Sequence, residues 1–264
     1  MRQRKVKNEE EKIAQYADWI LEEPQGWKGR WEQAYAGKRP AVKPLDANSR
    51  AAINIPETDN RLAAEPFEAG IYLEIGCGKG NFITTMARRF PQRQFLAVEG
   101  AKTVVLRALE KAAGGEPLGN IRFITAYVQT LSDLFEPGEV RGIYLNFSDP
   151  WPKERHAKRR LTHRRYLEEY RKIITPGGFL EFKTDNDALF DFSLREFQDF
   201  GLRISEATDD LHKLGNLCGR PRPAEQYGLP GPGEGAGLSA GVVTEYEGRF
   251  SAMRKNIHYC RVEF

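Results

Sequence analysis

From residue 70 onward, short apolar segments alternate with segments of helical periodicity, and this alternation constrains the fold more than any other feature of the sequence. Such alternation is typical of βαβ units, in which helices join the strands of a mainly parallel sheet. We therefore predict an α/β fold. The expected strands are 71–75, 94–98, 121–125, 142–147, 178–183, 203–207 and 258–264, and the expected helices are 82–90, 101–113, 162–174 and 188–200.

Two regions depart from this pattern. Apolar residues at 13, 16, 17, 20 and 21 predict one amphipathic helix that Pro24 ends, followed by a partly ordered connecting arm at 26–68. The segment 219–241 holds seven Gly and four Pro, which favours a flexible surface insertion. We expect an N-terminal arm at 1–68 and one α/β domain at 69–264.

Composition excludes several classes of protein. The 40 Lys and Arg residues against 37 Asp and Glu leave a net charge of +3, so the total charge identifies no partner. The three cysteines, at 77, 218 and 260, form no CxxC pair and predict neither a disulfide framework nor a cysteine zinc site. The charged first dozen residues are no signal peptide, and no window has 18 consecutive apolar residues. A cytoplasmic protein without a membrane partner is expected.

A glycine-rich loop follows the first predicted strand. Residues 74–81 read EIGCGKGN, and Gly76 and Gly78 permit backbone angles and close ligand approach that a Cβ would obstruct. Glu99 ends the second strand 23 residues after Gly76, where a carboxylate can accept hydrogen bonds from ribose hydroxyls. Loop and acid together indicate a ligand that contains adenosine.

The acids around this loop decide between ligands of that kind. Glu74 beside the loop would repel a pyrophosphate, and Asn81 stands where the dinucleotide fingerprint has its third glycine. A nicotinamide dehydrogenase is therefore the least favoured alternative. S-adenosyl-L-methionine, which carries a sulfonium cation, fits the acids better.

The fourth predicted strand leads into the most informative motif, YLNFSDPWPK at 144–153. Pro150 and Pro152 restrict the backbone around Trp151, so Asp149 is expected to be held at the carboxyl edge of the sheet. The alternative is that Asp149 caps a turn and Trp151 fills a core.

A basic segment comes directly after this motif. Residues 153–172 contain nine cations and three acids, a local net charge of +6 that leaves −3 for all other residues. Such a run is often a solvated face, but beside a ligand-binding edge it predicts a clamp for a phosphate backbone. His156 and His163 have no second ligand cluster near them, so we predict no metal site. The candidate backbone contacts are Lys153, Arg155, Lys158, Arg159, Arg160, Arg164 and Arg165, with Arg2, Arg4, Lys5 and Lys7 as an auxiliary arm.

The chain resembles the tRNA (guanine-N7-)-methyltransferase family of the bacterial single-chain type. The motifs that carry this resemblance are LEIGCGKGNF at 73–82, AVEG at 97–100, YLNFSDPWPKERHAKRRLTHRRYL at 144–167, FKTDN at 182–186 and TEYEGRF at 244–250. The resemblance implies a Rossmann-like class I methyltransferase with a seven-stranded sheet, helices on both faces and an antiparallel last strand. It also implies S-adenosyl-L-methionine as methyl donor and the variable-loop guanine (position 46) of tRNA as acceptor.

The resemblance further implies roles for individual residues. Asp149 would be the catalytic residue. Cofactor contacts would come from Glu74, Gly76, Gly78, Glu99, Tyr127 and Asp149, and substrate contacts from Lys153, Asp185, Thr244, Glu245, Tyr246 and Glu247. One departure is Tyr127, which stands where the family commonly has an acid, so that a carboxylate contact to adenine is absent there.

Two other functions remain open on sequence grounds. An exocyclic amine of a nucleic acid is an alternative methyl acceptor, because an Asp-Pro-aromatic loop at this place also serves that chemistry. A non-catalytic RNA-binding protein with a vestigial cofactor site is the second alternative, which Tyr127 favours and the intact acids at 74, 99 and 149 disfavour. We expect tRNA as partner, no obligatory protein partner, and a monomer or homodimer.

Overall fold

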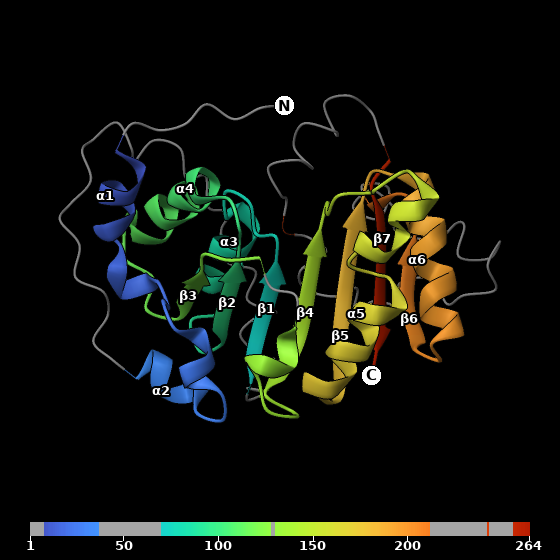
Figure 1. Ribbon diagram of the computed structural model, residues 1–264, viewed down its shortest axis with the longest axis horizontal. Helices are drawn as coiled ribbons and strands as arrows, with labels where there is room; N and C mark the ends of the chain where they lie inside the picture. Colours follow the sequence, from blue (N-terminus) through green and yellow to red (C-terminus); the bar gives the residue numbers. More distant parts are fainter. Residues whose placement is uncertain (1–7, 37–69, 128–129, 212–241, 243–255) are drawn as a thin grey trace. The chain divides into compact units, whose positions relative to one another are not determined.

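The computed structural model describes residues 8–36, 70–127, 130–211, 242 and 256–264 (Figure 1). The chain divides into two compact units, Met1–Phe135 and Glu136–Phe264. The predicted insertion at 219–241, the arm cations before residue 8 and the predicted substrate contacts at 244–247 lie outside the described residues. No helix in the described part is long and apolar enough to cross a lipid bilayer.

The first unit is built on three parallel strands, β1 (Ile71–Ile75), β2 (Gln94–Val98) and β3 (Ile121–Ile124). All five residues of β1 are buried, as expected of a strand covered on both faces. The connecting helices are α3 (Asn81–Arg89) and α4 (Lys102–Ala113). The predicted strands and helices of this region are confirmed to within a residue at each end.

The N-terminal segment differs from the single predicted helix. It forms α1 (Glu9–Ala14), the 3-10 helices η1 (Ala17–Trp19) and η2 (Pro24–Trp27), and α2 (Trp31–Tyr35). The prediction of one helix through residue 21 is wrong, because Ile20 is extended and forms a parallel bridge with Phe123 of β3. β3 is the edge strand of the sheet, so backbone groups along its outer side have no strand partner among the described strands. Pairing with Ile20 satisfies some of these groups, whereas another helical turn at Ile20 would leave them unsatisfied.

Aromatic anchors hold this segment on the first unit. The indole Nε1 of Trp19 donates to the carbonyl of Leu118 at 2.9 Å, and that of Trp31 donates to Leu134 at 3.0 Å. The Tyr35 hydroxyl donates to the carbonyl of Phe95 in β2 at 2.8 Å. Residues 26–35 of the predicted arm are therefore fixed by buried side chains whose hydrogen bonds are satisfied.

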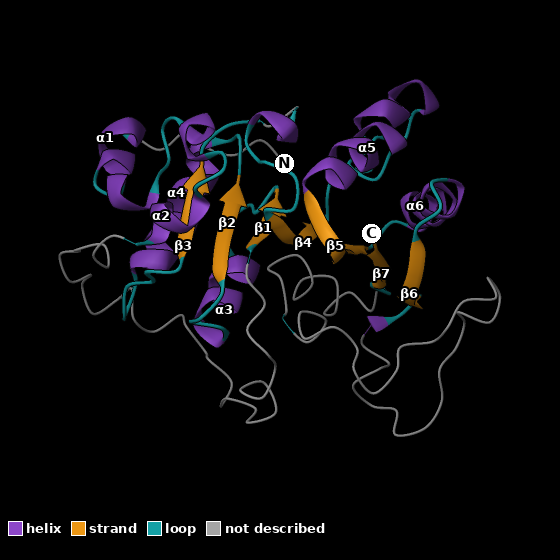
Figure 2. Ribbon diagram, turned by 90° about the horizontal axis from the view of Figure 1, so that it is seen from below, coloured by secondary structure: helices purple, strands orange, loops and turns teal. Residues whose placement is uncertain are grey.

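The second unit contains the remaining strands, β4 (Val140–Asn146), β5 (Ile174–Thr184), β6 (Arg203–Thr208) and β7 (His258–Glu263). β4 and β5 are parallel, whereas β7 is antiparallel to both β5 and β6. Helices α5 (Arg164–Ile173) and α6 (Asp187–Asp199) lie against one face of these strands (Figure 2). The strand order of the sheet is β3-β2-β1-β4-β5-β7-β6. The predicted seven-stranded, mainly parallel sheet with an antiparallel last strand is confirmed.

Candidate active site

The glycine loop after β1 uses backbone angles that glycine provides. Gly76, Gly78 and Gly80 have φ angles of 79°, 56° and 75°, a region that other residues rarely adopt. A Cβ on Gly80 would lie 2.5 Å from the Cβ of Ala108 in α4, so a glycine is also needed there for packing. The backbone N–H groups of Gly76 and Cys77 donate to the carbonyl of Val98 at 2.8 and 3.1 Å, which fixes the loop beside the end of β2.

Glu99 joins this loop to the end of β2. Its Oε2 accepts a hydrogen bond from the Gly78 N–H at 3.1 Å, and its Oε1 accepts one from the Ala101 N–H at 2.8 Å. Each carboxylate oxygen has a second lone pair, so these bonds orient Glu99 and leave it able to accept from a ligand. The residue predicted to bind ribose therefore also shapes the loop that would surround the ligand.

Two acids, Glu74 and Glu99, act electrostatically on the buried cysteine of the loop. Glu74 is only 2% exposed, and Cys77 beside it is buried. Burial raises the pKa of the Cys77 thiol well above its ordinary value, and the charges of Glu74 and Glu99 raise it further. The thiol is therefore neutral, and the charge of Lys111 partly offsets the effect of the two acids on it.

Lys111 of α4 supports the same loop from the other side, a role that the sequence analysis missed. Its Nζ donates to the carbonyl of Lys79 at 2.9 Å and to Oδ1 of Asn81. Asn81, the residue that breaks the dinucleotide fingerprint, is thus the first residue of α3 and a partner of Lys111. Lys111 lies in the helix after α3, about 30 residues from the loop, so no sequence motif near the loop indicates this contact.

Tyr127 lies directly beside Glu99. It is 79% exposed, and among the described residues it is the exposed large hydrophobic side chain. Its ring takes the space that a side chain at Gly100 would need, because a Cβ there would lie 2.4 Å from ring atoms. An aromatic face is therefore presented next to the acid that ends β2.

The Asp149 loop, which we define as residues 147–153, follows β4 in the second unit. Phe147 and Trp151 have φ angles of 52° and 42°, unusual values for residues with side chains. Asp149 itself is exposed and Trp151 only partly buried, and no hydrogen bond between described residues uses the Asp149 carboxylate. The alternative in which Asp149 caps a turn and Trp151 fills a core is therefore not supported.

Two arginines of the basic segment contact this loop. The Arg160 guanidinium donates from Nε to the Pro150 carbonyl and from Nη2 to the Trp151 carbonyl, both at 3.1 Å. The guanidinium carbon of Arg159 lies 4.8 Å from the centroid of the Trp151 ring. Arg160 is partly buried, whereas the other predicted backbone contacts are exposed, namely Lys153, Arg155, Lys158, Arg159, Arg164 and Arg165.

Asp185 follows β5, the strand that pairs with β4, within the second unit. Asn146 of β4 pairs with Lys183 of β5, and the Phe147 N–H continues this pairing to the Lys183 carbonyl at 2.9 Å. Asp149 and Asp185 therefore both follow the carboxyl ends of neighbouring parallel strands. Asn186 caps α6 directly after Asp185, its Oδ1 accepting from the Leu189 N–H at 2.8 Å.

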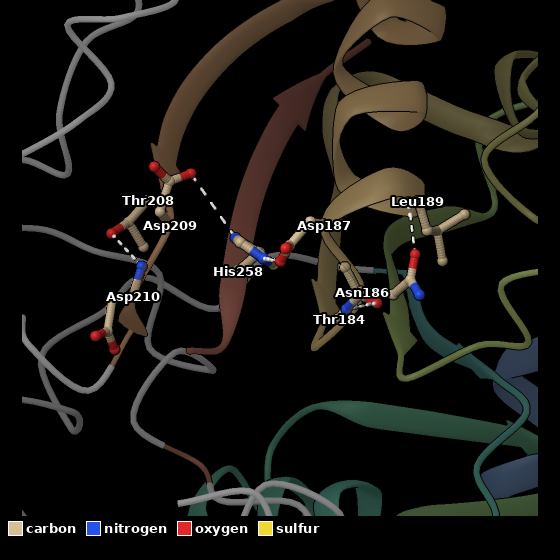
Figure 3. Close-up of polar contacts among 8 residues, drawn as sticks. All are labelled: Thr184, Asn186, Asp187, Leu189, Thr208, Asp209, Asp210 and His258. Carbon is tan, nitrogen blue, oxygen red and sulfur yellow. Dashed lines mark hydrogen bonds and ion pairs between the residues drawn. The ribbon is translucent and has the colours of Figure 1, made fainter. Parts of the chain in front are cut away.

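His258 fastens the start of β7 to the start of α6, and sequence reasoning gave it no role. Its Nε2 is 2.7 Å from Oδ1 of Asp187, and its Nδ1 is 3.7 Å from Oδ1 of Asp209 (Figure 3). The ring stacks on Phe190 at a centroid distance of 4.7 Å. Asp187 follows β5, Asp209 follows β6 and His258 begins β7, so the three residues are far apart in the sequence. No sequence motif could therefore indicate the contact.

Comparison with known proteins gives a consistent result. Residues 68–217 match a protein-family model described as "Putative methyltransferase". The chain is 32% identical over 252 residues to the tRNA (guanine-N(7)-)-methyltransferase of Bacillus subtilis strain 168, which covers 96% of this chain and 93% of that protein. It is 34% identical over 258 residues to the protein of that name from Lachnoclostridium phytofermentans, covering 98% and 96%. The chain belongs to the tRNA (guanine-N7-)-methyltransferase family.

A solved structure agrees with this family's fold. The crystal structure of the 16S rRNA methyltransferase KamB superposes with a TM-score of 0.51 at 12% sequence identity, covering 77% of this chain and 91% of that one. At this identity the likeness concerns the fold alone. It confirms the predicted class I methyltransferase fold for this member of the tRNA (guanine-N7-)-methyltransferase family.

Proposed function

We propose that this protein transfers the methyl group of S-adenosyl-L-methionine to N7 of the variable-loop guanine of tRNA. The observation that carries the proposal is the similarity to tRNA (guanine-N(7)-)-methyltransferases over 96% of the chain, at 32% and 34% identity. The acceptor base follows from these relatives, and the described loops supply residues suited to the chemistry. The protein acts in the cytoplasm, in accord with its free, buried Cys77 and Cys260 thiols.

The residues of the first unit fit the proposed cofactor. Gly76 and Gly78 leave open space where a Cβ would stand, so a ligand can approach the backbone. Glu99 would accept hydrogen bonds from the ribose hydroxyls, and the buried Glu74 would contribute negative potential that favours a sulfonium. When bound, the cofactor supplies an activated methyl group.

The acceptor nitrogen determines what the remaining residues must do. Guanine N7 has an in-plane lone pair, so no proton is removed before attack and no general base is needed. The protein must instead hold the base in line with the methyl group, and held geometry of this kind contributes roughly 7–11 kcal/mol in favourable models. Transfer leaves a positive charge on the purine, which the exposed Asp149 carboxylate stabilises electrostatically.

The guanine itself is held by acids and a hydroxyl. Asp149, Asp185 and Glu247 bind its N1–H and amino edge, and Thr244 helps to hold the ring. Glu245, Tyr246 and Lys153 are the further substrate contacts that the family resemblance implies. The positions of Asp149 and Asp185 after neighbouring strands support this assignment. The exposed cations of 153–165 contact the phosphate backbone and position the folded RNA.

The decisive experiment uses tRNA that lacks this modification. The protein is incubated with that tRNA and S-adenosyl-L-methionine labelled in the methyl group, and the nucleosides are analysed by mass spectrometry. 7-Methylguanosine, which carries a fixed ring charge, is expected. A methylated exocyclic amine would instead identify a different nucleic-acid methyltransferase, and tRNA binding without any methylated product would identify a non-catalytic RNA-binding protein.

A further inference from the structure

Arg160 makes contacts that differ from those of its cationic neighbours. Its guanidinium donates to two consecutive carbonyls of the Asp149 loop, those of Pro150 and Trp151. The flat face of the same group lies 4.3 Å from the ring centroid of Phe192 in α6. Two of its nitrogens and the flat face of its guanidinium group are thus engaged within the protein, and the side chain is only partly exposed.

The Asp149 loop requires such support. Pro150 and Pro152 have no N–H group, so the loop has few donors with which to bond to itself. Phe147 and Trp151 hold positive φ angles, which cost free energy and persist only where surrounding contacts impose them. The two carbonyls bound by Arg160 belong to the two residues that follow Asp149, so these bonds restrain the backbone that carries Asp149.

The residues after Arg160 are tied to α6. Oγ of Ser193 in α6 is hydrogen-bonded to Oγ1 of the fully buried Thr162 at 2.7 Å. The Arg164 N–H donates to Oε2 of Glu196 at 2.5 Å, also in α6. Arg160 therefore extends from a segment anchored on α6, and α6 begins two residues after Asp185.

We propose that Arg160 is a positioning residue that fixes the Asp149 loop against α6, and so sets Asp149 relative to Asp185, instead of contacting tRNA phosphate. The inference rests on the proposed function, because it gives these two acids a shared acceptor base. An arginine is required since its planar fork donates two bonds while stacking on Phe192. The ammonium group of a lysine provides the charge but neither the fork nor the flat face.

Replacement by lysine separates the two roles. For Arg160→Lys we expect kcat to fall by up to about 100-fold because the acids are displaced, while the Michaelis constant for tRNA and the salt dependence of tRNA binding stay within about twofold. A phosphate contact predicts the opposite result, with kcat kept by Arg160→Lys and with weaker, less salt-dependent binding in Arg160→Met. That result would overturn the inference.

Arg171 provides a matched control. Its Nη2 donates to the Phe200 carbonyl at 3.1 Å and its guanidinium lies 4.0 Å from the Phe200 ring, a related contact at the C-terminal end of α6 made by an exposed arginine. Arg171→Lys is expected to change thermal stability no more than Arg160→Lys does, with kcat unchanged. An equal fall of kcat in both variants would show a general effect on α6 and count against a specific role of Arg160.

Chemical rescue covers the case in which the lysine variant is unstable. Added ethylguanidinium should restore part of the kcat of Arg160→Ala, whereas sodium chloride of equal ionic strength should not. Absence of rescue in a folded variant with normal tRNA binding would contradict the bracing role. A wild-type protein that methylates no tRNA refutes the proposed function, whereas an active wild type with an unimpaired Arg160→Lys variant refutes only the role of Arg160.

Discussion

At the scale of single residues, Glu99 has a structural role beside the ribose contact that we propose for it. Glu99 accepts hydrogen bonds from the N–H groups of Gly78 and Ala101, and these bonds hold its carboxylate at the end of β2. Beside it, Tyr127 covers Gly100 and presents an exposed ring. Tyr127 presents an aromatic face at this place, and such a face suits a purine by stacking instead of by charge.

Substitutions of Tyr127 test this stacking role. Stacking of a base on an aromatic side chain contributes about 1–3 kcal/mol, so Tyr127→Ala should weaken binding of S-adenosylhomocysteine by about 5- to 150-fold. Tyr127→Phe keeps the ring and should bind within about twofold of wild type. Isothermal titration calorimetry measures both affinities, and an Ala variant that binds like the wild type would exclude the stacking contact.

At the scale of elements, the loop after β4 carries the exposed Asp149, and Arg160 holds the backbone of this loop by hydrogen bonds to two of its carbonyls. Because the Asp149 carboxylate is exposed, its removal should not unfold the protein. Asp149→Asn keeps the size of the side chain and removes the charge, and we expect kcat to fall by about 100-fold or more with an unchanged melting temperature. Single-turnover methyl transfer measures the first quantity, and near-normal turnover would contradict the catalytic assignment. Glu154→Gln, an exposed acid five residues later, is the matched control.

The N-terminal segment is a second case at the scale of elements. Its helices are short, and buried aromatic side chains hold it on the first unit. Trp31 is 3% exposed, stacks on Phe135 at a centroid distance of 5.0 Å and donates to the Leu134 carbonyl. Truncation of such a side chain leaves a cavity and an unsatisfied carbonyl.

For Trp31→Ala we therefore expect the free energy of unfolding to fall by about 3–5 kcal/mol, measured by urea denaturation. The partly buried Trp27, which stacks with Arg30 at 5.7 Å, offers a comparison. Trp27→Ala should cost less than half as much. Equal losses in the two variants would show that burial does not decide the contribution of these residues.

At the scale of the whole molecule, charge is segregated along the sequence. The net charge of +3 combines +6 within residues 153–172 with −3 elsewhere. Within the basic segment, Arg160 is committed to the Asp149 loop, whereas Arg155 and Lys158 are exposed. Exposed cations such as Arg155 and Lys158 can displace counterions from RNA.

The double variant Arg155→Ala/Lys158→Ala tests this distinction. Each phosphate contact contributes about 0.7–0.9 to the slope of log affinity against log salt, so the double variant should bind tRNA more weakly and lose roughly 1.4–1.8 of slope. Fluorescence titration of tRNA across salt concentrations measures this, and affinity for S-adenosylhomocysteine should be unchanged. An unaltered slope would remove both residues from the backbone contacts.

The sequence by itself determined the strands, most of the helices and the glycine loop, whereas the roles of the acids at 74, 99, 149 and 185 stay predictions. These depend on local properties: apolar periodicity sets strands and helices, and glycine or proline sets the loops between them. The helix at 13–21 failed because its outcome depended on a distant partner, the edge of β3, and not on its own periodicity. The residues at 244–247 lie outside the described part, so their substrate contacts stay a prediction.

Only the tertiary structure decided which cation braces a loop and which remains exposed. Arg159 and Arg160 are adjacent and chemically identical, yet one stacks on Trp151 at the surface and the other bonds to two carbonyls. The same holds for Lys111 beneath the glycine loop and for His258 between Asp187 and Asp209. Such contacts join residues far apart in the chain, and a side chain selects its partner only after packing has brought the candidates within hydrogen-bond distance.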